Sequence, residues 1–304
     1  MTLHIYFVVL EVVLALGVIC MNLLVCTTVY LHKELRSLTN YLIVCLAVAD
    51  LGVGILAIPF SIILSMEYTL CFYLCLFMAC FPLVTTQFSI FVLLVIAINT
   101  HLKIRLPQRY TIFVTKKKVM LAVALCWFLS ILIGFTPMMG WNGFNQYKEK
   151  NLYSDIHSSH MGRCSFRTVI SPAYLVYFIF FICMLAPLLT MLSIYTDLFC
   201  LVRDYFVSQS LRPAKRPETY SARTLLLLVG LFCFCWLPFH VLDCFLLFCP
   251  SCEIHSSLTF LAVLLSHLNS LVNPLVYAIR KRAFGAAFYS VFARCFPLLS
   301  KVNR

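Results

Sequence analysis

Charged residues are scarce in this chain of 304 residues: they make up 11% of it, whereas 62% is hydrophobic. Roughly a quarter of a soluble domain is ordinarily charged, and a soluble core cannot absorb so large an apolar excess. A bilayer can, because it solvates helices that are apolar on every side. The shortage of charge therefore excludes an ordinary soluble domain and predicts an all-α membrane protein in a lipid bilayer.

Acidic residues are fewer than basic ones: the chain has 11 Asp and Glu and 23 Lys and Arg, which gives a net charge of +12. Such a surplus can indicate nucleic-acid binding. Here, however, the basic residues lie in short connections between apolar segments, and no basic stretch is interleaved with aromatic residues on a polar domain. Nucleic acid is therefore not expected as a partner.

Metal-site and catalytic signatures are also missing. The 16 cysteines have no zinc-ligand spacing, because Cys249-Pro-Ser-Cys252 lacks a second ligand pair. No nucleophile and base form a recognisable constellation, so the chain is not expected to be an enzyme. A transporter or channel is a remote alternative, because we find neither an inverted repeat nor a charged pore ring.

Seven apolar runs are long enough to span the hydrocarbon core, which takes about 20 helical residues. The runs cover roughly 4–31, 40–65, 72–104, 117–138, 172–203, 219–248 and 256–280. Backbone polar groups cannot stay unpaired in lipid, so each run is expected to be a helix. Residues 281–293 alternate basic and aromatic side chains, which predicts a short amphipathic eighth helix along the membrane surface. We expect one seven-transmembrane domain over residues 1–304.

The basic residues also predict the orientation. All but four of the 23 Lys and Arg lie in the connections on one side of the spans or at the chain end; the exceptions are Lys148, Lys150, Arg163 and Arg167. Loops rich in Lys and Arg stay in the cytoplasm. The N-terminus is therefore expected outside the cell and the C-terminus in the cytoplasm.

Polar side chains at membrane depth are costly, so each is a candidate functional residue. Those in the predicted spans that we single out are Glu11, Asp50, Ser89, His240, Asp243, His267, Asn269 and Asn273. The alternative is that they only hydrogen-bond helices together. Asp50 fits that alternative least, because a lone buried carboxylate should be paired, protonated or bound to a cation.

Prolines recur in or at the ends of several spans, at Pro137, Pro187, Pro238 and Pro274. A proline removes one helical hydrogen bond and kinks the helix. A bundle with kinks at several levels can open a cavity on one face and repack on another. This pattern favours a conformational switch over a rigid anchor.

Four motifs carry a specific resemblance: Leu46-Ala-Val-Ala-Asp50, Trp127, Cys235-Trp-Leu-Pro238 and Asn273-Pro-Leu-Val-Tyr277. With seven spans they resemble the class A (rhodopsin-like) G-protein-coupled receptors over nearly the whole chain. Segments 75–81, 136–142, 248–252 and 266–278 resemble adenosine receptors, nearest the type-two branch. The resemblance implies a plasma-membrane receptor that binds a nucleoside-like small molecule from outside and signals to a heterotrimeric G protein. A receptor dimer is a further partner that it allows.

The resemblance also implies a ligand pocket open to the outside. Residues carried over to it are Glu11, Leu83, Thr86, Phe166, Trp236, Phe239, His240, Ser266 and His267. Phe166 would stack on a flat heterocycle, and Ser266 and His267 would meet a ribose together with Thr86. Glu11 would hold the imidazole in one tautomer. The alternatives are a loop contact for Phe166 and ordinary helix packing for Leu83 and Phe239.

Asp50, Ser89, Asn269, Asn273 and Trp236 match the internal sodium site of that family. Hard oxygen ligands around one carboxylate suit a small cation. The alternative is a structural water network. We expect no other cofactor.

The resemblance implies two disulfides, Cys75–Cys164 between the third span and the second outer loop, and Cys249–Cys252 in a small outer ring. Cys71 then stays unpaired on the outer side. Cys295 follows the surface helix, where receptors are often palmitoylated; a plain hydrophobic thiol is the alternative.

Two departures from the family alter the pocket. Asp243 stands where the family has Asn, and an ionised carboxylate only accepts hydrogen bonds. This disfavours adenosine and favours a donor-rich or cationic ligand, unless Asp243 is protonated. Arg167 stands beside Phe166 where some relatives have an acid, and it favours anionic or carbonyl-bearing ligands. A salt bridge from Asp243 to Arg167 or to His255 is the alternative, so the sequence does not identify the ligand.

The third departure is Asn99-Thr100-His101, which stands where the family has Asp-Arg-Tyr. In that family the Arg pairs with its neighbouring acid and a Glu of the sixth span in the inactive state, and packs on the G protein in the active state. Glu218 keeps the sixth-span position, but Thr100 offers no cation. A hydroxyl–carboxylate bond is weaker than a charge-assisted pair. A protonated His101 paired with Glu218 is an alternative.

We therefore predict a weaker inactive-state contact and impaired G-protein activation. Tyr195, Pro274 and Tyr277 remain available for the active arrangement. The leading interpretation is an adenosine-receptor-like protein with altered ligand preference and coupling. The alternative is a non-signalling receptor that acts as a ligand sink or as a dimer partner.

Overall fold

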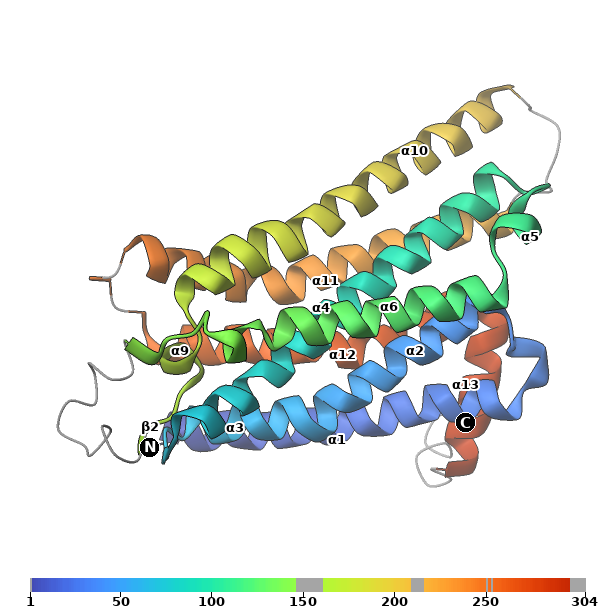
Figure 1. Ribbon diagram of the computed structural model, residues 1–304. Helices are drawn as coiled ribbons and strands as arrows, with labels where there is room; N and C mark the ends of the chain where they lie inside the picture. Colours follow the sequence, from blue (N-terminus) through green and yellow to red (C-terminus); the bar gives the residue numbers. More distant parts are fainter. Residues whose placement is uncertain (1, 146–160, 209–215, 250, 253, 296–304) are drawn as a thin grey trace.

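The computed structural model describes residues 2–145, 161–208, 216–249, 251–252 and 254–295, without the side chains at 2, 202–208, 216–223 and 225. Long helices run side by side in one bundle (Figure 1). Within the described residues, seven helices are long and apolar enough to cross a membrane. The predicted seven-helix membrane fold is confirmed.

The spanning helices are described first. They are α1 (Thr2–Leu31), α2 (Leu38–Gly52) continued by η2 (Val53–Ala57) and α3 (Ile58–Ser65), α4 (Phe72–Arg105), α6 (Lys116–Gly134), η4 (Tyr174–Leu185) continued by α10 (Ala186–Ser208), α11 (Arg216–Phe248) and α12 (Ser256–Arg280). The shorter elements are η1 (Lys33–Leu35), β1 (Thr69–Cys71), α5 (Tyr110–Phe113), η3 (Thr136–Met139), β2 (Met161–Arg163), α9 (Phe166–Val169) and α13 (Arg282–Cys295).

Side-chain caps fix two helix starts on the basic side of the bundle. The Ser37 hydroxyl accepts from the Asn40 backbone N–H at the start of α2, and the Thr115 hydroxyl accepts from the Lys118 N–H at the start of α6. Each cap satisfies one of the unpaired N–H groups of a helix N-terminus. These polar caps lie where the apolar runs begin.

Three of the approximate span boundaries differ from the helices by three residues or more. The fourth span was expected to reach residue 138, but α6 ends at Gly134 and η3 follows, with Pro137 inside it. Proline has no N–H to continue an α-helix. The fifth helix is described as far as Ser208 rather than 203, and the sixth from Arg216 onward rather than 219, because an apolar run reports only the lipid-facing part of a helix.

Proline also shapes the interior of two spans. Both π-helical segments, η2 and η4, end shortly before a proline, Pro59 and Pro187. The i→i−4 bond cannot form at a proline, and a locally wider turn is one way to accommodate it.

Helix α4 lies at the centre of the bundle, where it contacts α2, α6, α10 and α11. Gly134 allows α6 to approach it closely, since a Cβ at that position would lie 2.4 Å from Val84 Cγ2. On the outside, apolar residues such as Val13, Leu16, Met120 and Leu121 are exposed. In a bilayer these side chains face lipid.

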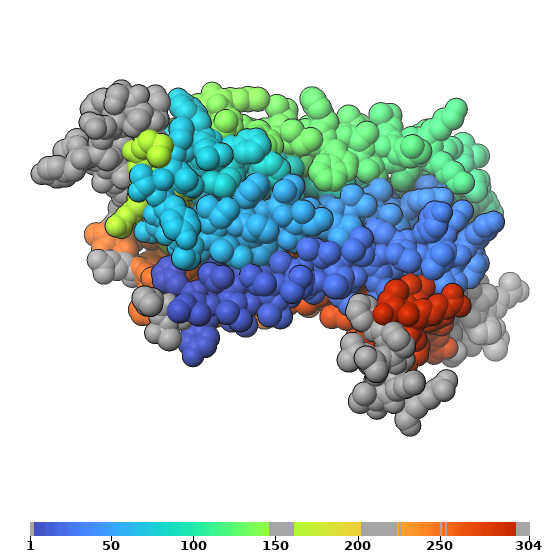
Figure 2. Space-filling model, turned by 90° about the horizontal axis from the view of Figure 1, so that it is seen from below, coloured from blue at the N-terminus to red at the C-terminus, as the bar shows by residue number. Residues whose placement is uncertain are grey.

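Helix α13 lies against α1 and α12 at the end of the bundle opposite β2 and α9 (Figures 1 and 2). Its buried residues are Phe284, Ala287, Phe288 and Val291, a spacing of three and four that forms one helical face. The helix covers residues 282–295, close to the expected 281–293. Its one-sided burial makes it the amphipathic eighth helix.

Candidate functional site: an outer cavity and the polar residues beneath it

A disulfide-tied loop covers the end of the bundle that is predicted to face outward, called the outer end below. Strand β1 pairs antiparallel with β2, with Thr69 opposite Arg163 and Cys71 opposite Met161. Just beyond the strands, the predicted Cys75–Cys164 disulfide fixes the loop to the start of α4. Helix α9, which carries Phe166 and Arg167, therefore lies over the end of α4.

Beneath this loop is a cavity of about 890 Å³, a size ordinary for small-molecule sites. Of the predicted ligand residues, those on its wall are Leu83, Thr86, Phe166, Trp236, Phe239, His240, Ser266 and His267. Phe166 packs edge-on against Phe239, with ring centroids 5.9 Å apart. A largely apolar wall with a few polar groups suits a flat, partly polar ligand.

The wall histidine His267 has a fixed partner. Its Nδ1 lies 2.9 Å from both carboxylate oxygens of Glu11, which is fully buried on α1 and is not part of the cavity wall. If Nδ1 carries the proton, Nε2 is left to accept a hydrogen bond from a ligand. Glu11 thus orients a ligand-facing residue rather than facing the ligand itself.

Besides Arg167, three residues of the cavity wall have buried side-chain nitrogen or oxygen atoms without a hydrogen-bond partner in the described structure. The atoms are Gln87 Oε1, Trp236 Nε1 and both ring nitrogens of His240. Phe180 stacks on His240 at 5.1 Å and holds the ring in place. Gln87 was not among the residues predicted from the sequence; a buried amide in an apolar helix was the available signal.

Asp243 lies outside the cavity wall. It is 3% exposed, and its Oδ2 has no hydrogen-bond partner among the described residues. Neither Arg167 nor His255 forms an ion pair with it within 4.0 Å in this part of the chain. Burial lowers the pKa of the Arg167 guanidinium, and the nearby Asp243 carboxylate partly opposes that shift. The two charges interact at a distance rather than through a direct salt bridge.

Deeper in the bundle, Asn273 Nδ2 donates to Asp50 Oδ2 at 3.0 Å, while Asp50 Oδ1 has no hydrogen-bond partner. Ser89, Asn269 and Trp236 line a small void of about 10 Å³, enough for about one water-sized particle. Asp50 and Asn273 are not part of the wall of this void. The described residues contain no cluster of three or more His, Cys, Asp or Glu. One carboxylate among neutral oxygens suits a hard monovalent cation better than a transition metal.

Asn99 and Thr100 are both buried at the opposite end of α4. Asn99 Oδ1 accepts from the Tyr110 hydroxyl of α5 at 2.9 Å, and its Nδ2 donates to Thr39 Oγ1 at 3.4 Å. Thr100 donates to the Ile96 carbonyl of its own helix at 2.7 Å. Asn99 therefore joins α4 to α2 and α5, whereas the Thr100 hydroxyl bonds within its own helix.

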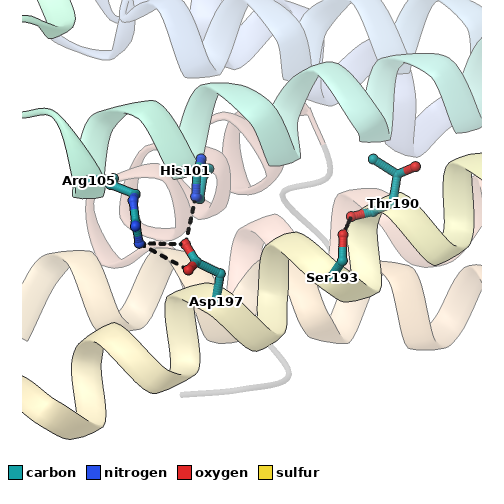
Figure 3. Close-up of polar contacts among 5 residues, drawn as sticks. All are labelled: His101, Arg105, Thr190, Ser193 and Asp197. Atoms are coloured by element: carbon teal, nitrogen blue, oxygen red, sulfur yellow. Dashed lines mark hydrogen bonds and ion pairs between the residues drawn. The ribbon is translucent and has the colours of Figure 1, made fainter.

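His101 forms a contact that sequence reasoning missed. Its Nε2 lies 2.8 Å from Asp197 Oδ2 on α10, and Arg105 Nη1 donates to both oxygens of Asp197 at 2.9 and 3.0 Å (Figure 3). Glu218, the partner considered from sequence, lies in α11, but its side chain is outside the described part. The missed signal was Asp197 itself, an acid near the inner end of a predicted span.

Near the start of α13, Lys281 Nζ donates to Asn40 Oδ1 at 3.0 Å and lies 6.0 Å over the Tyr277 ring. Burial, together with nearby Lys103, lowers the pKa of Lys281 to about 8. The amine of Lys281 thus lies where α2, α12 and the start of α13 meet.

Tyr277 is buried and packs against Phe284. Pro274 lies within α12, and Tyr195 is half-buried on α10.

The other cysteines singled out from the sequence lie at the two ends of the bundle. Cys249 and Cys252 form the second predicted disulfide. Cys71, in β1, is a free thiol that is partly exposed, and Cys295, the last residue of α13, is a free and exposed thiol.

Comparison with known proteins decides the family. The sequence model of the family "7 transmembrane receptor (rhodopsin family)" matches residues 21–277. The chain belongs to that family. The receptor is 42% identical over 295 residues to adenosine receptor A2a of Homo sapiens. The aligned region covers 94% of this chain and 71% of the relative. It is also 40% identical over 304 residues to adenosine receptor A2b of Gallus gallus, and this alignment covers 95% of this chain and 88% of the relative.

Within this receptor, the predicted residues fall into three groups along α4. The cavity residues gather under the outer loop, the Asp50 group lies midway, and Asn99, Thr100 and His101 lie at the far end. Asp243 and Glu11 are the two predicted ligand residues that do not reach the cavity wall. The receptor is a multi-pass protein of the plasma membrane, related to adenosine receptors, and is not an enzyme.

Proposed function

We propose that this receptor binds a nucleoside-like molecule in the cavity under the outer loop, with its N-terminus outside the cell. The observation that carries the proposal is the pairing of a stacking surface with an oriented polar group. Phe166 lies at one part of the wall, and His267, held by Glu11 at 2.9 Å, lies at another. A heterocycle fits the first and a sugar hydroxyl fits the second.

Binding can be tested with purine riboside, a nucleoside without a group at purine position 6, on purified receptor in lipid nanodiscs. We expect saturable stabilisation that falls by about tenfold in affinity or more in Phe166→Ala, since a lost aromatic contact typically costs that much. Phe292→Ala, on α13 at the far end of the bundle, is the matched control and should bind normally. Equal binding by wild type and Phe166→Ala would contradict the proposal.

We further propose that coupling to G proteins is impaired. Thr100 supplies no positive charge where the family has Arg, and its hydroxyl bonds to the Ile96 carbonyl at 2.7 Å. A hydroxyl committed to its own helix adds little to an interface with a partner protein. His101 and Arg105 are paired with Asp197 in the same region. These contacts support a receptor whose inner face is held by different interactions from those of its relatives.

The coupling proposal is tested by guanine-nucleotide exchange on a panel of G proteins, with purine riboside as ligand. Wild type should give little exchange, and the double variant Asn99→Asp, Thr100→Arg should give more. Ser193→Ala, which removes a hydroxyl bonded to the Thr190 carbonyl of its own helix, is the control. Strong exchange by wild type would contradict the proposal.

The alternative function is that of a non-signalling receptor, a ligand sink or a dimer partner. The same Thr100 contact favours it. Ligand binding without exchange in both wild type and the double variant would support this alternative, since restoring the family residues would then not restore output.

Finally, we propose that Asp50, Ser89, Asn269 and Asn273 hold a sodium ion, with Trp236 above them. The carboxylate oxygen without a hydrogen-bond partner is what fits a cation there. The ion would supply counter-charge to Asp50. Sodium chloride should raise the thermal unfolding temperature more than choline chloride does, and Asp50→Asn should remove that difference. A difference that persists in the variant would contradict a sodium ion at this position.

A further inference from the structure

Arg167 is a charged residue on the wall of the outer cavity. It lies in α9 next to Phe166, and its side chain is part of the cavity wall. Its Nη2 is buried and has no hydrogen-bond partner among the described residues. A guanidinium can only donate hydrogen bonds. A buried donor of this kind costs free energy until an acceptor reaches it.

Asp243 supplies a counter-charge but not the missing acceptor. It lies on α11, is 3% exposed and does not reach the cavity wall. In the described structure no ion pair within 4.0 Å joins it to Arg167, although its charge acts on the guanidinium. No described residue accepts a hydrogen bond from Nη2 of Arg167, so the side chain keeps this hydrogen-bonding capacity for a molecule in the cavity, which Nη2 meets once the side chain turns it out of its enclosed position.

We propose that Arg167 makes this receptor selective for a heterocycle that presents a neutral carbonyl oxygen to α9, such as a 6-oxopurine nucleoside. Asp243 is a positioning residue in this arrangement. This assignment rests on the proposed nucleoside function, and it adds which edge of the heterocycle faces α9. Phe166 and Phe239, 5.9 Å apart, form the aromatic wall beside which that edge lies.

The selectivity follows from donor and acceptor matching. A ring amino group carries two donors, so against Arg167 it would set donor against donor and leave both buried and unpaired. A carbonyl accepts from the guanidinium instead. Sites that hydrogen-bond a ligand group discriminate strongly against analogues that lack it, because the site's own polar group is then left unpaired. An anionic oxygen would also accept, but the buried Asp243 charge disfavours a second negative charge nearby.

The test compares inosine, adenosine and purine riboside, whose purine position 6 carries a carbonyl, an amino group and hydrogen. Affinities are measured by ligand-dependent thermal stabilisation of the full receptor in nanodiscs. Inosine should bind about tenfold to a hundredfold more tightly than adenosine, as expected for a hydrogen bond to a charged group. Arg167→Gln should shrink that ratio, and Arg167→Glu should reverse it. Arg163→Gln, which removes an equal charge from the same loop outside the cavity wall, should leave it unchanged.

Purine riboside separates two kinds of failure, because it has no group to meet Arg167. If none of the three nucleosides binds, the proposed function itself is overturned. Purine riboside can also bind equally to wild type and Arg167→Gln while the affinity ratio of inosine to adenosine is the same in both proteins. That result overturns only the carbonyl assignment. If Arg167→Gln loses purine riboside as well, the variant has lost the whole site, and Arg167→Lys, which keeps the charge but not the fork of donors, takes its place. A smaller inosine preference in Arg167→Lys with normal purine riboside binding supports the assignment, whereas an unchanged inosine preference or a preference for adenosine overturns it.

Inosine 5′-monophosphate, which differs from inosine only by an anionic phosphate, tests the choice of a neutral acceptor. We expect it to bind less tightly than inosine to wild type and to gain relative to inosine in Asp243→Asn, because that variant removes the opposing negative charge. A purely structural role of Asp243 would change both affinities alike and would overturn its part in the proposal. Wild-type preference for the monophosphate over inosine would overturn the assignment of a neutral carbonyl.

Discussion

Glu11 and His267 show how one residue can serve the site through another. Glu11 is fully buried and contacts the imidazole, which in turn faces the cavity. Removing one member of a buried pair leaves the other uncompensated, at a cost of roughly 3–5 kcal/mol. We therefore expect Glu11→Ala to lower the thermal unfolding temperature markedly, Glu11→Gln to lower it less, and the double variant Glu11→Ala, His267→Ala to recover part of the loss.

Glu67→Ala is the control for that series. Glu67 is also an acid at the outer end, but its side chain is 53% exposed and lies 3.7 Å from Arg163, so its removal should change stability little. Additive losses in the Glu11 and His267 double variant would show that the pair is not energetically coupled.

Lys281 predicts a pH dependence. Its pKa falls from 10.5 to about 8 in the folded receptor, chiefly through burial. Below about pH 8 both states are protonated, and the folded state bears the cost of burying the ammonium. Between the two pKa values only the unfolded state keeps the proton, so stability from this group rises with pH. The stability advantage of Lys281→Met over wild type at about pH 7 should shrink by about pH 10.

Thermal unfolding across that pH range measures the effect. Lys116→Met, an exposed lysine in the first turn of α6, should follow the wild-type curve in parallel. A constant gap between Lys281→Met and wild type over the whole range would be incompatible with the shifted pKa. The variant also loses the bond to Asn40, so the trend with pH is the informative quantity, not the offset.

Between elements, Asp197 joins α4 to α10 through His101 and Arg105 (Figure 3). The three side chains are 26–50% exposed, so solvent screens the contact and it should act mainly on helix spacing rather than on stability. We expect Asp197→Asn to widen the distance distribution between spin labels on the inner ends of these helices. The charge-swapped pair Asp197→Arg, Arg105→Asp should restore it. Ser193→Ala should not alter it, and equal distributions in wild type and Asp197→Asn would refute the role.

The same elements indicate how far sequence reasoning reaches. The spans could be predicted because lipid admits only apolar helices, and the two disulfides followed from the family resemblance. The π-helical segments could not, since hydropathy records the type of side chain and not the turn at Pro59 or Pro187. The partner of His101 was missed because Asp197 is 96 residues away. The distance of Asp243 from the cavity wall depends on helix rotation, which a motif match does not specify.

For the whole molecule, the uneven distribution of Lys and Arg between the two ends predicts the orientation in the membrane, which the helix bundle alone does not. The outer loop, the cavity and both disulfides lie at one end, and most Lys and Arg lie in the connections of the other. Disulfides persist in oxidising surroundings and basic loops stay in the cytoplasm, so both features give the same orientation. An N-terminal epitope should be stained on intact cells and a C-terminal epitope only after permeabilisation. The reverse pattern would place the cavity in the cytoplasm, where no extracellular nucleoside reaches it, and would overturn the receptor orientation together with its ligand.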